Sequence, residues 1–230
     1  MRRIIVFLFM AALLVAAPAS AQDQAVNVNL GGGYTFALSE VREHLGDGYN
    51  INFGLWFNVT PTIAIQVEYS YNGLGKKQIN IPPDQLPAGA TQSDVFADMN
   101  MQYGNFNLVF KPPTESKAKP YIIAGAGVYY RPVKVTTPVI GYVPPYCDPW
   151  WYYCWPGGFV EADQILASES TTGFGIDFGG GITFQASDAV GIYIEARYHY
   201  IWGPELKDNS GKSYGKANGQ FLPITFGLRF

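Results

Sequence analysis

The residues best suited to chemistry in this sequence are six ionisable side chains that stand between apolar neighbours. Three carboxylates and three guanidinium groups brought together would form either a buried, hydrogen-bonded ion network or a path for ions and protons. We expect the network, because burying such charges without partners is prohibitive. A switchable gate made of the same charges is the alternative. The six residues are Glu68, Arg131, Asp177, Glu195, Arg197 and Arg229.

The sequence contains two cysteines, Cys147 and Cys154. In an exported chain, where thiols oxidise, their short spacing predicts an intramolecular disulfide. Tight metal binding would need further Cys or His ligands nearby, and the sequence around the pair offers none. We therefore expect no metal site and no cofactor.

Aromatic side chains crowd the segment around the two cysteines. One interpretation is a rigid binding surface, since Tyr and Trp give large contact areas at low entropic cost. The other is that the rings pack against the molecule or into a membrane interface. Segments 133–137 and 164–172 are suited to extend two strands into a protruding ribbon, which favours exposure. The aromatic residues are Tyr146, Trp150, Trp151, Tyr152, Tyr153 and Trp155.

The two histidines give little support for catalysis. A hydrolytic or acyl-transfer site would place a histidine beside a serine and an acid. His199 lies between two tyrosines with no adjacent serine. His44 would have to meet Ser93 and Asp94, which are ordinary loop residues. We therefore expect no catalytic residues and no enzyme activity.

The elements that must position these side chains are eight segments in which apolar and polar residues alternate. At the end of the chain, Phe226, Leu228 and Phe230 share one face, whereas Thr225 and Arg229 share the other. This period of two predicts β-strands with one face toward lipid and the other toward an interior. The eight segments are 26–38, 49–58, 63–72, 99–110, 120–131, 173–184, 190–202 and 222–230.

The fourth segment is the least regular. Its apolar residues fall on opposite parities in 99–103 and in 106–110, so we expect a β-bulge near Gly104 and Asn105. The connections alternate between three short inner turns and longer outer loops around 39–48, 74–96, 134–170 and 203–216. Outward tyrosines then gather at the outer strand ends and phenylalanines at the inner ends, which predicts two aromatic girdles.

Composition and the N-terminus indicate the cellular compartment and the fold class of the chain. A basic start, the apolar stretch 4–17 and the small residues 19–21 predict a secretory signal peptide over residues 1–21, which leaves 22–230 as one domain. The 26 Gly, 16 Tyr and 15 Phe favour an all-β fold. The formal net charge of −3 at pH 7 argues against nucleic acid as a partner.

The eight alternating segments, the strand at 120–130 and the Gly-Leu-Arg-Phe terminus together resemble a known family. It is the small outer-membrane β-barrel family that includes the OmpA membrane domain, OmpX and Opa-like surface proteins. The resemblance implies an all-β, eight-stranded antiparallel up-and-down transmembrane β-barrel in the outer membrane of a Gram-negative bacterium. It also implies that Phe226, Leu228 and Phe230 form a C-terminal signal for the barrel-assembly machinery. Because the sequence stops at Phe230, we do not expect the peptidoglycan anchoring of full-length OmpA proteins.

The expected function follows from the width of such a barrel. Eight strands leave room only for their own side chains, so we expect a filled lumen. We therefore expect a monomeric surface-interaction or envelope-integrity protein that acts through its extracellular loops. Its expected partners are outer-membrane lipid, lipopolysaccharide and an extracellular ligand or host surface. A narrow gated channel is the first alternative, and a lipid A-modifying enzyme the second.

Overall fold

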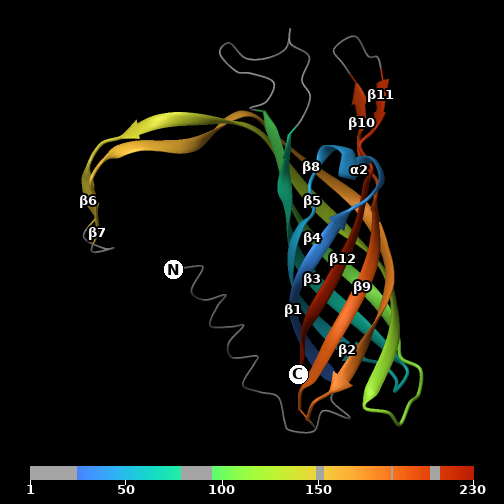
Figure 1. The fold of residues 1–230 in the computed structure, drawn as a ribbon. Coiled ribbons are helices and arrows are strands. Elements are labelled where there is room, and N and C mark those ends of the chain that lie inside the picture. Colours follow the sequence, from blue (N-terminus) through green and yellow to red (C-terminus); the bar gives the residue numbers. More distant parts are fainter. Residues whose placement is uncertain (1–24, 79–94, 149–152, 188, 208–212) are drawn as a thin grey trace.

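The computed structural model describes residues 25–78, 95–148, 153–187, 189–207 and 213–230 of the chain. Eight long strands close into one antiparallel barrel in the order β1-β12-β9-β8-β5-β4-β3-β2 (Figure 1). The predicted all-β, eight-stranded, up-and-down barrel is confirmed. The strands are β1 Val26–Ala37, β2 Gly48–Asn58, β3 Ile63–Gln78, β4 Phe96–Phe110, β5 Ala118–Val143, β8 Gly158–Gln185, β9 Gly191–Ile201 and β12 Gly219–Arg229.

The alternation of the sequence sorts side chains to the two faces of the barrel wall. Apolar residues such as Leu30, Phe106 and Phe178 are exposed on the outside, while polar residues on the opposite parity are buried inside. The ring closes between β1 and β12, where Val28 and Phe230 exchange backbone hydrogen bonds of 2.9 and 3.0 Å. The outward face of β12 carries Phe226 and Leu228, and Phe230 follows the strand; these are the residues of the expected assembly signal.

The predicted bulge in β4 is wrong. Pairing with β3 runs unbroken from Ile63↔Phe110 to Leu74↔Met99, and the register shifts only beyond Leu74. Met99, Met101 and Tyr103 keep the inward parity and are buried inside the barrel. The alternation inverts because the outer end of β4 carries its apolar residues toward the interior and its polar residues outward.

Short elements complete the outer end of the molecule. Helix α2 (Ser39–His44) follows β1, and a small hairpin of β10 (Glu205–Lys207) and β11 (Ser213–Lys216) lies between β9 and β12. No helix within the described ranges is long and apolar enough to cross a membrane. The expected signal peptide, residues 1–21, lies outside the described residues.

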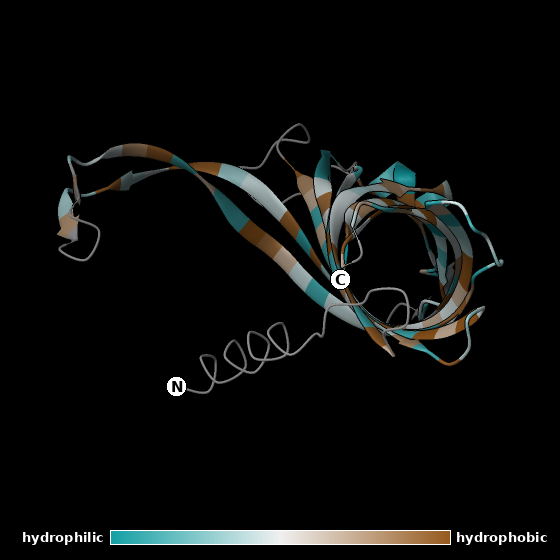
Figure 2. Ribbon diagram, turned by 90° about the horizontal axis from the view of Figure 1, so that it is seen from below, coloured by the Kyte–Doolittle hydropathy of each residue, from teal (hydrophilic) through white to brown (hydrophobic). Residues whose placement is uncertain are grey.

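Strands β5 and β8 continue past the barrel as a two-stranded ribbon. Pairing of β4 with β5 reaches only Phe96↔Thr136, whereas β5 and β8 stay paired to Val143↔Gly158. We call residues 137–164 the outer ribbon. It arches away to one side of the barrel, and its tip turns downward at a distance from the wall (Figures 1 and 2). The predicted protruding ribbon is therefore present, and it is bent.

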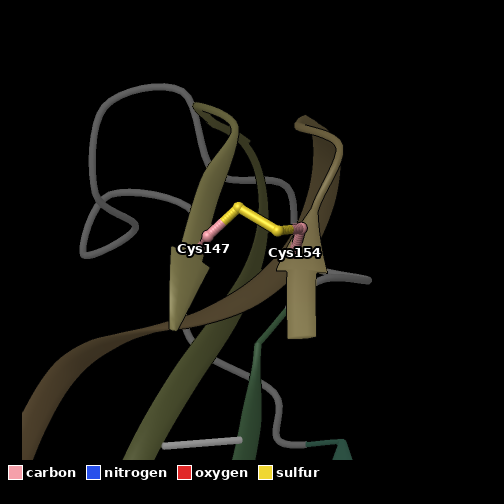
Figure 3. Close-up of a disulfide and its surroundings, with 2 residues drawn as sticks. All are labelled: Cys147 and Cys154. Atoms are coloured by element: carbon pink, nitrogen blue, oxygen red, sulfur yellow. A yellow bond between two sulfur atoms is a disulfide. The ribbon is translucent and has the colours of Figure 1, made fainter. Parts of the chain in front are cut away.

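At the tip, β6 (Tyr146–Asp148) pairs with β7 (Tyr153–Trp155) as a separate two-stranded sheet. A disulfide bond between Cys147 and Cys154 joins these two strands (Figure 3). The spacing of the two cysteines predicted this bond.

Candidate functional site

The middle of the lumen holds a cluster of one guanidinium and three carboxylates. Arg197 on β9 forms ion pairs with Glu68 on β3, with Glu195 at 2.7 Å from Nε, and with Asp177 on β8 at 3.5 Å from Nη1. All four side chains are at most 3 % exposed. The inward parity of β3, β8 and β9 brings them together, as the sequence predicted.

Each carboxylate has a second, neutral hydrogen-bond partner, from its own strand for Glu68 and from across the lumen for Glu195 and Asp177. Gln66 donates to Glu68 at 2.9 Å, the Tyr121 hydroxyl donates to Glu195 at 2.8 Å, and the Asn105 amide donates to Asp177 at 2.7 Å. These hydrogen bonds hold the acids at fixed positions around the guanidinium. Nevertheless, three acids share one base, so negative charge is in excess.

Two arginines predicted for this network lie at the opposite ends of the lumen, where their positions along the strands predicted them. Arg131 stands six residues along β5 from the partner of Asp177, about 20 Å at the rise of a strand, and donates to the Ala217 carbonyl at the outer end. Arg229 lies at the inner end, where Nε donates to Asn29 at 2.8 Å and Nη1 to Thr183 at 2.7 Å. The expected balance of three bases against three acids is therefore wrong. Parity gives the face of a residue correctly, but distance along the strand separates these charges.

Apolar layers cover the charge cluster on both sides. Toward the outer end, nine buried residues pack into one layer, and toward the inner end a second layer of five lies beneath it. Sequence reasoning missed both layers, although inward Met and Tyr on β4 were a signal for the first. The outer layer is Leu45, Leu74, Ala97, Met99, Met101, Tyr103, Tyr129, Ile201 and Phe221; the inner layer is Trp56, Ala64, Val109, Tyr121 and Ile123.

His199 belongs to the lumen packing. It is fully buried, its Nδ1 lies 2.8 Å from the Tyr129 hydroxyl, and its ring centroid lies 5.0 Å from that of Tyr103. No serine is among these contacts. His44 is in α2, and Ser93 and Asp94 lie outside the described residues.

The outer ribbon carries the two most exposed large apolar side chains among the described residues, Ile140 and Phe159. Ile140 is 77 % exposed, Phe159 is 78 % and Tyr142 is 61 %. Tyr142 and Phe159 are cross-strand partners whose ring centroids lie 5.5 Å apart. Tyr146, from the expected aromatic surface, is also exposed. Of the remaining aromatic residues of that surface, Tyr153 and Trp155 belong to β7, whereas Trp150, Trp151 and Tyr152 lie outside the described residues.

Comparison with known proteins identifies the family. No curated protein matches the chain. The family described as outer membrane protein beta-barrel domain matches residues 7–230. This chain belongs to that family. It is accordingly a protein of the Gram-negative outer membrane.

Solved structures share the barrel at low sequence identity. Neisserial surface protein A has a TM-score of 0.50 and 15 % identity over 90 % of this chain and 96 % of its own. A major outer membrane protein from Thermus thermophilus has a TM-score of 0.53 and 10 % identity over 90 % of this chain and 99 % of its own. At such identities the likeness shows only the fold of this chain, so its role must be argued from its own residues.

Proposed function

We propose that this barrel is a surface-interaction protein whose outer ribbon engages the lipopolysaccharide layer beside the barrel, and that it supports envelope integrity. The observation that carries the proposal is the apolar, exposed tip of the ribbon. Ile140, Tyr142 and Phe159 stand on one face of a hairpin that extends beyond the barrel wall. Fully burying side chains of this size is worth about 1.5–3 kcal/mol each, so binding to a surface that covers them is strongly favoured.

The ribbon needs such a cover for its own stability. A lone two-stranded hairpin is marginally stable in water at best. The face opposite Ile140 carries Val139, Val143 and Val160, so both faces contain apolar residues. The disulfide ties only the tip. A partner that covers a face would supply the burial that the ribbon itself lacks.

The edges of the ribbon are poorly suited to binding. Pro138 removes a backbone N–H donor from the free stretch of β5, and Glu161 and Asp163 place charges along β8. Proline and charged residues are the usual protection of edge strands against further strand pairing. The ribbon is therefore suited to contact through a face.

The bend of the ribbon favours a lipid surface over a distant receptor. Its tip turns downward at a distance from the barrel wall, to a level beside the barrel (Figure 1). Tyr142, Tyr146 and Phe159 lie near the tip, whereas Asp163 lies near the root and pairs with Lys76 of β3. Aromatic side chains toward the tip and charges toward the root, with Glu161 opposite Ile140 between them, follow the polarity of a membrane interface.

Hydrogen exchange on the refolded protein tests the proposal. We expect slower exchange in the ribbon when nanodiscs contain lipopolysaccharide than in detergent micelles. The double variant Ile140→Ser/Phe159→Ser should lose this protection. The matched control is Ile165→Ser, because Ile165 is 55 % exposed on β8 but stands at the ribbon root. Cells carrying the double variant should also become more sensitive to large hydrophobic antibiotics at unchanged barrel levels.

Two outcomes would overturn the lipopolysaccharide target. One is equal exchange of the wild-type ribbon in micelles and in lipopolysaccharide membranes. The other is an equal loss of protection in the Ile165→Ser control.

A further inference from the structure

The inner end of the barrel opens into a cavity of about 600 Å³. Its volume falls within the range of roughly 300–1,000 Å³ that is usual for ligand sites. The inner turns and the inner ends of β1, β2, β5, β8, β9 and β12 surround it. Its walls combine aromatic, amide and cationic side chains, among them Asn27, Trp56, Lys111, Lys119, Tyr121 and Arg229.

Three cations face this cavity from three different strand ends. Lys111 follows β4, Lys119 lies at the start of β5 and Arg229 ends β12, each on the inward parity of its strand. Among the described residues no carboxylate side chain lines the cavity, and none forms an ion pair with these cations. Burial, together with the charges of Arg229 and Lys119, lowers the pKa of Lys111. The side-chain charge of this wall is therefore positive.

Lys111 donates to Asn58 at 2.6 Å, but two other hydrogen-bond donors in the wall lack acceptors. The Arg229 guanidinium carbon lies 3.5 Å from the centroid of the Trp56 ring, which fixes it across the inner end. Its Nε and Nη1 are hydrogen-bonded, but its Nη2 is buried without a partner. Trp56 is 1 % exposed, and its Nε1 also has no partner. Unpaired buried donors are costly, so a ligand that accepts hydrogen bonds here would be stabilised.

We propose that this inner vestibule binds a phosphate group. A tetrahedral phosphate offers oxygens in several directions, which suits cations that converge from three strand ends. A carboxylate presents two oxygens in one plane and would reach fewer of them. Two sources share the required chemistry: a soluble phosphate ester of the periplasm and the headgroup of an inner-leaflet phospholipid. The proposal does not depend on the outer ribbon.

Binding to the refolded mature chain, residues 22–230, tests the proposal. The barrel is placed in micelles of a phosphorus-free detergent and titrated at low salt with inorganic phosphate, glycerol phosphate or acetate, followed by calorimetry and ³¹P NMR. We expect saturable binding of a phosphate probe and much weaker binding of acetate. If only nanodiscs that contain phosphatidylglycerol give a bound ³¹P signal, the headgroup is the source.

Single lysine variants assign binding to the cavity. Lys111→Met and Lys119→Met should each weaken phosphate binding roughly tenfold, the change expected for a lost hydrogen bond to a charged group. The control is Lys117→Met, which removes the same charge from an exposed position of the same turn that does not line the cavity. Heat-modified gel mobility verifies that each variant is folded, and a folded Lys119→Met is sufficient for the comparison.

The proposal is overturned if neither phosphate probe saturates and the phosphatidylglycerol signal is absent. It is equally overturned if Lys117→Met weakens binding as much as Lys119→Met, because nonspecific charge would then explain the effect.

Discussion

Arg197 is the residue on which the order of the lumen depends. It pairs with Glu68, Asp177 and Glu195, and all four side chains are buried. Removing one partner of a buried ion pair leaves an uncompensated charge, which is far more costly than the net worth of the pair. Because three acids share one base, losing the base and losing one acid should have very different effects.

Substitution of the base and of one acid separates the two effects. Arg197→Met should lower the free energy of unfolding by about 3–5 kcal/mol, since three acids would remain without a cation. Glu195→Gln should change it by less than about 1 kcal/mol, because it removes excess negative charge and the Tyr121 hydroxyl can turn to accept the new amide. Urea unfolding in lipid vesicles measures both values. Equal losses in the two variants would show that charge balance does not govern this cluster.

At the scale of the strands, the sequence predicted correctly which side of the barrel wall most side chains occupy. It predicted poorly which side chains contact one another. Alternation placed Glu68, Asp177 and Arg197 in the lumen because a strand turns successive side chains to opposite faces. It misassigned β4, because an apolar residue at Met101 is equally suited to lipid and to an apolar interior. Likewise, no local pattern in the sequence shows that the guanidinium of Arg229 stacks on Trp56 of β2, a contact that depends on closure of the ring.

Glycines on β5 show how closely neighbouring strands fit. A Cβ added at Gly127 would lie 1.9 Å from the Asn105 Oδ1 and 2.3 Å from a backbone oxygen, whereas one at Gly141 meets nothing within 4 Å. Asn105 holds Asp177, so Gly127 makes room for the charge cluster. Gly127→Ala should therefore cost about 1–3 kcal/mol in urea unfolding. Gly141→Ala, the same change on the outer ribbon, should leave barrel stability unaltered, and a comparable loss there would contradict the steric account.

The whole molecule separates three environments along the barrel axis. A ribbon extends outside the outer end, apolar layers enclose a charged cluster in the middle, and a basic cavity opens at the inner end. Alternation in the sequence indicated the barrel and the ribbon, since both follow from strand pairing. The sideways bend of the ribbon and the layering of the lumen arise from tertiary packing, which a single strand pattern does not encode.

This layering predicts that the barrel does not conduct. Ions would have to pass through the buried outer layer around Met101 and Phe221 and the buried inner layer around Trp56, where shedding their water is costly. Planar-bilayer recordings of the refolded protein should therefore be silent. Arg197→Ala and Glu195→Ala should stay silent as well, because both layers remain in place. Reproducible current steps that change with Arg197→Ala would instead make the charge cluster a gate and the lumen the functional site.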